Sequence, residues 1–205
     1  MIEPRRIAQS GEETDGRRRR SLDSRAQIVS ALLDLVRQGD VAPSAERVAA
    51  RANVALRTVF RQFNDMDSLL REMWGVIESE LAAVLAAPLV GSDWRERFID
   101  LIAKRAVVHE KIAPYRRAAN ANRHRSAFLF EGHGRMVASA RRALEAILPE
   151  SVRNDLVLVE MLDLLLSFET WSRLRSEQGL SVPQARDCLE LTVRRLIGSA
   201  PEGGA

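Results

Sequence analysis

Apolar residues recur at the three-to-four-residue spacing of helices from residue 21 onward, and no segment alternates polar and apolar residues over the length of a strand. Glycine and proline interrupt this pattern at intervals and divide it into segments. The pattern predicts an all-α fold of about nine helices, over 22–38, 45–52, 55–63, 66–87, 93–111, 113–124, 127–148, 152–177 and 182–197.

Residues 1–20 have no apolar periodicity and include the run Arg17-Arg18-Arg19-Arg20. We expect this segment to be largely disordered. Two interpretations stay open: it is a basic arm that contacts nucleic-acid phosphates, or it is a solvated tail.

Segment 44–63, SAERVAARANVALRTVFRQF, contains two short helical stretches joined by a tight turn at 52–54. Helices this short are stable only when they pack on each other and on the preceding helix. Asn53 stands in the turn, where it tolerates a left-handed backbone better than any residue except glycine. This arrangement is typical of a helix-turn-helix. Its expected core consists of Val48, Ala49, Ala52, Val54, Val59 and Phe63.

The second short helix is expected to present a polar and aromatic face. An arginine there can donate two hydrogen bonds to guanine in the major groove of DNA. The exposed face is predicted to carry Leu56, Arg57, Thr58, Phe60, Arg61 and Gln62. The chain would then divide into an arm (1–20), a helix-turn-helix domain (21–64) and a helical ligand-binding and dimerisation domain (65–200).

Residues Arg25–Leu70 resemble the DNA-binding domain of TetR/AcrR-type transcriptional regulators. The match covers 46 residues and fixes core, turn and cap positions together. It includes Arg25, Ile28, Ala31, Leu35, Gly39, Pro43-Ser44, Val48-Ala49, Ala52-Asn53-Val54, Thr58-Val59-Phe60, Phe63 and Leu69-Leu70.

The resemblance implies a role for each matched polar residue. Arg57, Thr58 and Arg61 would face the groove of a double-stranded, palindromic operator. Ser44 and Arg25 would contact phosphates, and Leu56 and Phe60 would make apolar contacts with the DNA. A solvated surface charge is the alternative for each arginine.

The sequence departs from the family pattern at three positions. Asn53 replaces the usual turn glycine, Phe60 a usual tyrosine and Met66 a usual lysine. In the family the tyrosine and lysine commonly contact phosphates, so their loss would weaken DNA binding and reduce its salt dependence. We expect the Arg17–Arg20 run to compensate if it contacts DNA.

Segment 156–174 is apolar around more than one helix face, so it must be buried on several sides. One side can face its own domain and the other a second copy of the chain. We therefore predict a homodimer through helices 152–177 and 182–197, as the resemblance also implies. The alternative is a monomer in which 156–174 is wholly internal.

A ligand pocket is harder to place, because apolar residues in this part of the chain can equally be core. The candidates for a small-molecule effector site are Phe98, Ile102, His109, Phe130, Met136, Met161, Phe168 and Trp171. Polar residues nearby are more informative, because a buried acid must be paired, protonated or ligand-bound. These residues are Arg105, His133, Glu160, Asp163 and Glu169.

The formal net charge of +3 is unevenly distributed. Residues 1–64 carry 12 arginines and 8 acids, net +4, whereas the rest of the chain has net −1. Arginine supplies a planar fork of donors that suits phosphate. The excess positive charge therefore lies where the DNA-binding residues are predicted.

Other sequence features exclude several classes. The single cysteine, Cys188, cannot form an intramolecular disulfide, and we expect it in the core of the last helix. No apolar run has the length of a membrane span, and residues 1–24 do not resemble a signal peptide. No HExxH, GxSxG or glycine-rich phosphate motif occurs. We expect a cytoplasmic protein that is not an enzyme and has no cofactor or metal.

The leading hypothesis is a homodimeric transcriptional regulator, a repressor released by a small-molecule effector. The alternatives are a DNA-binding regulator without such an effector and an all-helical enzyme or carrier. The sequence does not identify the effector or the operator, and it does not distinguish repression from activation.

Overall fold

The computed structural model describes residues 8–198, and within 8–20 it describes only the side chain of Arg19. In this range all regular secondary structure is helical and no strand occurs, which confirms the all-α prediction. The elements are α1 (Ala8–Arg37), α2 (Ala45–Arg51), α3 (Leu56–Gln62), α4 (Met66–Ala86), α5 (Trp94–Asn122), the 3₁₀ turn η1 (Arg123–Arg125), α6 (Ala127–Glu145), α7 (Glu150–Arg153), α8 (Leu156–Leu165), α9 (Phe168–Ser172), the π-helical turn η2 (Arg173–Glu177) and α10 (Val182–Gly198).

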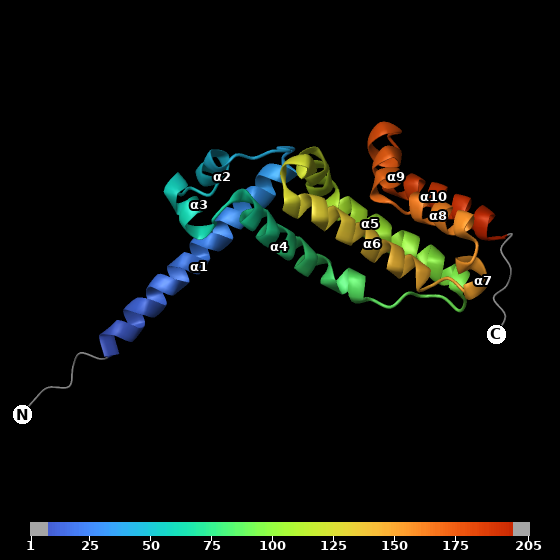
Figure 1. The fold of residues 1–205 in the computed structure, drawn as a ribbon, viewed down its shortest axis with the longest axis horizontal. Helices are drawn as coiled ribbons and strands as arrows, with labels where there is room; N and C mark the ends of the chain where they lie inside the picture. Colours follow the sequence, from blue (N-terminus) through green and yellow to red (C-terminus); the bar gives the residue numbers. More distant parts are fainter. Residues whose placement is uncertain (1–7, 199–205) are drawn as a thin grey trace, which may run out of the picture.

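The first helix is longer than the sequence predicts. It begins at Ala8 and so includes residues 8–20, where the sequence pattern predicts a largely disordered segment, and Ser21 lies inside it. Neither Gly11 nor Gly16 ends the helix. Glycine lowers the stability of a helix much less than proline does, so a helix can continue through it. The N-terminal half of α1 extends away from the other helices (Figure 1).

The helix-turn-helix unit forms from local signals. Gly39 ends α1 with a positive φ of 94°, a conformation that glycine adopts without strain. Asp65 begins α4 in a capping box, in which its carboxylate accepts from the Ser68 amide at 2.7 Å. As Figure 1 shows, α2 and α3 pack beside α1 at the end of the molecule opposite α7.

Two predicted helices, 93–111 and 113–124, are one helix in the structure. Pro114 lies inside α5, which continues to Asn122. A proline removes one backbone hydrogen bond but does not prevent a helix that packing stabilises. Ile112, Tyr115 and Arg116 flank Pro114 and are all buried, and this burial accounts for the continuity.

Segment 152–177 differs from the prediction in the opposite sense: the sequence pattern predicts one helix, but the structure has several. It is divided into α7, α8, α9 and η2. The break after α8 lies at Ser167, whose hydroxyl caps α9 by accepting from the Thr170 amide at 3.1 Å. Such a cap starts a new helix with a new direction.

The buried apolar residues form two clusters. The N-terminal cluster joins α1 to α4 and also includes Ile112 and Tyr115 of α5 and Phe168 of α9. The C-terminal cluster lies among α5, the end of α6, and α7 to α10, and it contains Phe98 and Trp171. Phe168 and Trp171, three residues apart on α9, therefore contribute to different clusters.

Among the described helices, none combines the length and the apolar character that a membrane span requires. Within the same range, no group of three or more His, Cys, Asp or Glu side chains is placed to hold a metal ion.

Candidate nucleic-acid interface and ligand pocket

The turn between α2 and α3 has the geometry that a helix-turn-helix requires. Asn53 adopts a left-handed φ of 51°, as predicted from its place in the turn. The Val54 amide donates to the Ala49 carbonyl at 3.0 Å and closes the turn. Buried Val48, Ala49 and Val59 join α2 and α3 to the N-terminal cluster. The turn therefore fixes the orientation of α3 relative to α1.

The outer face of α3 carries three exposed side chains, Arg57, Phe60 and Arg61. They lie three and four residues apart and so share one face of the helix. Phe60 is 53% exposed, which is unusual for a large aromatic side chain without a partner. Thr58 is half-buried, and Leu56 packs partly against the N-terminal cluster, so Leu56 is less available to DNA than predicted.

Arginines near this face differ in their ion pairing. Arg51 lies 2.7 Å from a carboxylate oxygen of Asp34, and Arg47 lies 2.6 Å from one of Asp40. In the described part of the chain, neither Arg57 nor Arg61 has a carboxylate within 4 Å. The arginines of the α3 face are thus the ones left free for an external anion or base.

Arg25 has a different environment from the one predicted. Its Nε donates to Glu72 Oε2 at 2.6 Å, its Nη1 donates to the Gln62 carbonyl, and its guanidinium lies 4.2 Å from the centre of the Phe63 ring. These contacts tie α1 to the end of α3 and to α4. Arg25 is therefore a positioning residue for α3, and a phosphate would have to compete with Glu72 for it.

The other residues predicted to contact phosphate are Ser44 and the Arg17–Arg20 run. Ser44 is exposed and caps α2, where its hydroxyl oxygen accepts from the Arg47 amide at 3.3 Å. Of the Arg17–Arg20 run, only the side chain of Arg19 lies among the described residues, and it is exposed. Whether the run contacts DNA stays a prediction.

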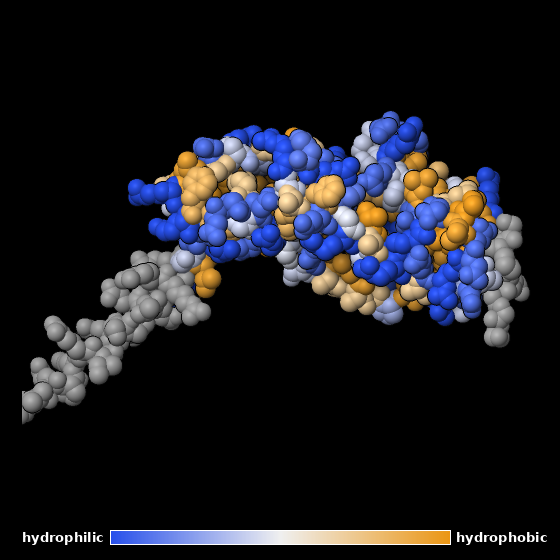
Figure 2. Space-filling model, in the orientation of Figure 1, coloured by the Kyte–Doolittle hydropathy of each residue, from blue (hydrophilic) through white to orange (hydrophobic). Residues whose placement is uncertain are grey.

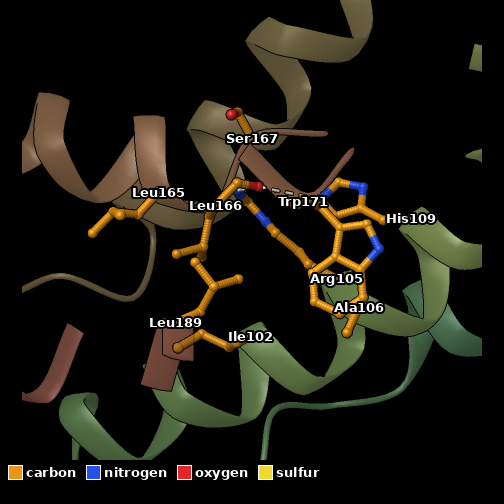
Figure 3. A pocket seen from close by; sticks show the side chains of 9 residues that line it. All are labelled: Ile102, Arg105, Ala106, His109, Leu165, Leu166, Ser167, Trp171 and Leu189. Atoms are coloured by element: carbon orange, nitrogen blue, oxygen red, sulfur yellow. Dashed lines mark hydrogen bonds between the residues drawn. The ribbon is translucent and has the colours of Figure 1, made fainter. Parts of the chain in front are cut away.

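A small pocket lies where α5 meets the break between α8 and α9 (Figure 3). Its empty volume is about 190 Å³, and it is too narrow to admit a water-sized sphere. In this structure the pocket is therefore closed. It is lined by Ile102, Arg105, Ala106, His109, Leu165, Leu166, Ser167, Trp171 and Leu189.

Three of the eight predicted effector residues line this pocket: Ile102, His109 and Trp171. Phe98 and Phe168 are buried in the two apolar clusters, and Met136 packs against the N-terminal cluster. Phe130 and Met161 are 67% and 42% exposed and do not line this pocket. The helical period could not identify them as outward-facing, because α6 and α8 each leave a large face uncovered.

Two polar side chains of α5 reach the Leu166 carbonyl from within the pocket. Arg105 Nη1 donates to it at 3.1 Å, and His109 Nε2 donates to it at 3.2 Å. Burial lowers the pKa of Arg105 to about 10 and that of His109 to about 4. His109 is therefore neutral at pH 7.

Six residues that line the pocket are absent from the predicted list: Arg105, which the sequence marks only as a nearby polar residue, Ala106, Leu165, Leu166, Ser167 and Leu189. A signal existed for Arg105: residues 102, 105, 106 and 109 share one face of a helix, and that face combines apolar residues with a cation and an imidazole. Nothing in the sequence indicates that Leu166 would join them, because this depends on the helix break at Ser167.

The acids within the apolar 156–174 segment are paired inside the chain. Arg141 lies 2.9 Å from Glu160 and 3.4 Å from Asp163. Arg116, which is 3% exposed, donates to Glu169 at 3.1 Å. Pairing within one chain accounts for these three acids, so they do not indicate a ligand.

An exposed apolar face runs along α8. Val157, Met161 and Leu164 lie at helical spacing and are 71%, 42% and 66% exposed. On α10, Leu191 is 52% exposed and Cys188 is also exposed, contrary to the expectation that it lies in the core. In Figure 2, hydrophobic residues gather at the end of the molecule where α8 and α10 lie.

The architecture matches solved structures of transcriptional regulators. One from Rhodococcus sp. Rha1 aligns over 86% of this chain and 97% of its own, with a TM-score of 0.66 and 17% identity. A TetR-family transcriptional regulator from Haemophilus influenzae aligns over 88% of this chain and 98% of its own, with a TM-score of 0.51 and 18% identity. This chain has the TetR-type fold. The same fold occurs in the multidrug binding protein EbrR, solved in complex with imidazole, over 89% of this chain and 93% of that one (TM-score 0.61, 19% identity).

The likeness is one of structure. No family model matches this sequence, and no curated protein matches it. The arrangement of the helices is therefore what identifies the TetR-type fold.

Proposed function

We propose that this chain is a sequence-specific DNA-binding transcriptional regulator that acts in the cytoplasm. The observation that carries the proposal is the outer face of α3, where Arg57, Phe60 and Arg61 are exposed and the two arginines lack ion pairs among the described residues. A guanidinium donates two hydrogen bonds to guanine in the major groove, and an aromatic or aliphatic side chain meets a thymine methyl. The TetR-type fold, shared with transcriptional regulators, supports this interpretation.

The proposed active form is a homodimer in which α8 and α10 of two copies pack together. The exposed apolar residues Val157, Met161, Leu164 and Leu191 support it, because a contiguous apolar surface of this kind marks an interaction site. A two-fold dimer presents two α3 helices to two half-sites, which suits a palindromic operator.

The proposed regulation is repression that a small-molecule effector relieves. An effector in the pocket between α5 and the α8–α9 break would favour a dimer whose α3 helices no longer match the operator spacing. EbrR, a multidrug binding protein solved with imidazole, is a protein of this fold that takes a small molecule.

Selection of genomic DNA fragments with the purified protein tests the function directly. We expect a defined sequence to be enriched. Arg57→Ala should then weaken binding to it by about 1–3 kcal/mol and relax the preference at one base pair. Arg153→Ala is the matched control, because it removes an exposed arginine from α7, far from α3.

Failure to enrich any sequence would contradict the proposal. An equal loss for Arg57→Ala on all DNA sequences would contradict base recognition by that residue. Deleting residues 1–20 tests the arm separately. A phosphate-binding arm would lower the affinity for every sequence alike, whereas a solvated tail would leave affinity unchanged.

A further inference from the structure

The carbonyl oxygen of Leu166, at the end of α8, lies between two donors of the kind that bind an anion. It accepts from Arg105 Nη1 at 3.1 Å and from His109 Nε2 at 3.2 Å, and both donors come from α5 (Figure 3). A carbonyl at the C-terminal end of a helix carries a partial negative charge. At one end of the pocket, two hydrogen-bond donors, Arg105 Nη1 and His109 Nε2, therefore point at the same backbone oxygen, that of Leu166.

Arg105 has no acidic partner. Its guanidinium donates to two backbone carbonyls, those of Leu166 and of Ala140 at 2.6 Å. In residues 8–198, no carboxylate lies within 4 Å of it; Asp163 on α8 acts on it only from a distance and is paired with Arg141. Arg105 is half-buried, and its positive charge has no neutralising charge within ion-pair distance, which is costly.

His109 presents a second unsatisfied group. Because its Nε2 must carry hydrogen to donate to a carbonyl, Nδ1 of the neutral ring is an acceptor. Nδ1 is buried and has no hydrogen-bond partner in the described part of the chain. The charged groups acting on this ring are Arg105 and Arg116 of α5 and Glu169 of α9.

We propose that the pocket binds an organic carboxylate, one oxygen of which replaces the Leu166 carbonyl on Arg105 and His109. A full negative charge is a stronger partner for a guanidinium than a carbonyl dipole is. Because the pocket admits no water-sized sphere in this structure, the apolar part of the ligand would have to move Ile102, Trp171 and Leu189 apart to lie among them. The inference rests on the proposed function, since it names the effector class for that site.

Replacing the Leu166 carbonyl by a ligand carboxylate would have a structural consequence. Leu166 and Ser167 immediately precede Phe168, which is buried in the N-terminal cluster with α1 to α4. A carboxylate that displaces the Leu166 carbonyl would free the α8–α9 junction and shift Phe168, and thus act on the packing that supports α3.

Calorimetry on the wild-type chain tests the ligand class without any substitution. The probes are benzoate, 1-naphthoate and decanoate, each compared with its primary amide at pH 7. We expect at least one acid to bind about tenfold or more tighter than its amide. If no acid binds more tightly than its amide, the proposal is wrong.

A pair of variants locates the site. Arg105→Gln should weaken binding of the preferred acid at least about tenfold and leave the amide unaffected. Arg97→Gln is the control, because Arg97 lies on the same helix and its Nε also donates to a backbone carbonyl, that of Gly91 at 3.3 Å, outside the pocket. Equal losses in the two variants would overturn the assignment of Arg105. If Arg105→Gln does not fold, the comparison of acid with amide in the wild type decides.

The outcome can be separated from that of the proposed function. If the protein enriches a DNA sequence but does not prefer carboxylates to amides, the anion site is wrong and the regulator proposal stands. If it prefers carboxylates but enriches no sequence, the regulator proposal fails and the anion site stands.

Discussion

The imidazole of His109 lies edge-on to the ring of Phe168, with the ring centroids 5.7 Å apart and the planes at 68°. His109 lines the pocket, whereas Phe168 is buried in the N-terminal cluster with α1 to α4. Arg116, also buried, lies 5.2 Å from the centre of the same phenyl ring. Phe168 is therefore a direct contact between the pocket and the packing of the helix-turn-helix.

Phe168→Ala should destabilise the protein by about 3–5 kcal/mol, because it leaves a cavity between the two parts of the chain. Urea denaturation measures the change in the free energy of unfolding. Phe130→Ala is the control: Phe130 is 67% exposed, so its truncation should change stability by only about 0.5 kcal/mol. Equal effects of the two substitutions would contradict the role of Phe168.

Glu72→Gln distinguishes two roles for Arg25. If Arg25 positions α3, weakening its ion pair with Glu72 should reduce operator affinity. If Arg25 instead binds phosphate directly, releasing it from Glu72 should increase that affinity. We expect a decrease of about threefold to tenfold, on the scale of one charge-assisted hydrogen bond.

Fluorescence anisotropy with a labelled operator measures this difference. Glu78→Gln is the matched control, because it removes an exposed carboxylate from the same helix and so reports the general effect of one fewer negative charge. A gain in affinity that exceeds the gain from Glu78→Gln would restore the phosphate role of Arg25.

The stability of the protein should fall as pH drops from about 6.5 to about 4. Burial lowers the pKa of His109 from 6.5 to about 4 in the folded chain. Between these values the unfolded state binds more protons than the folded state, so acid favours unfolding. The contribution of this residue is up to ~3 kcal/mol.

Chemical denaturation at several pH values, repeated on His109→Gln, isolates that contribution. The variant should lose less stability between pH 6.5 and pH 4 than the wild type does. His124→Gln, which removes an exposed imidazole in η1, should retain the wild-type dependence. An unchanged pH dependence in His109→Gln would show that the imidazole is not the group that titrates.

Leu164→Glu should weaken the proposed homodimer by at least about 2 kcal/mol, because it places a charge within the exposed apolar face of α8. Sedimentation equilibrium at several concentrations reports the change. Leu85→Glu on α4 is the control, since Leu85 is equally exposed, at 65% against 66% for Leu164, and lies outside that face. If both variants dimerise like the wild type, α8 is not the interface; if the wild type is monomeric, the dimer proposal fails.

The helix-turn-helix could be predicted from the sequence because its signals are local. Asn53 in the turn, Gly39 after α1 and the Asp65 cap each act over a few residues, and the structure confirms the left-handed backbone predicted at Asn53. The exposed face of Arg57, Phe60 and Arg61 follows from the helical period alone. The contact at the start of α10 is also local: the Ser181 amide donates to Gln184 Oε1 at 2.9 Å.

The role of Arg25 could not be predicted from local signals. Its carboxylate partner, Glu72, is 47 residues away along the chain, and only the packing of α4 on α1 brings them together. The sequence marks Arg25 as a conspicuous cation near a DNA-binding motif, whereas its neighbours determine whether the cation is free.

The sequence by itself determined the all-α class, the helix-turn-helix and the face of α3, since helical period, capping and turn residues act over one or two turns of chain. Tertiary structure alone decided the course of α5 through Pro114, the break at Ser167 and the pocket. These features depend on which faces of distant helices pack together. The packing energy of such contacts exceeds the local preference of a single proline or serine.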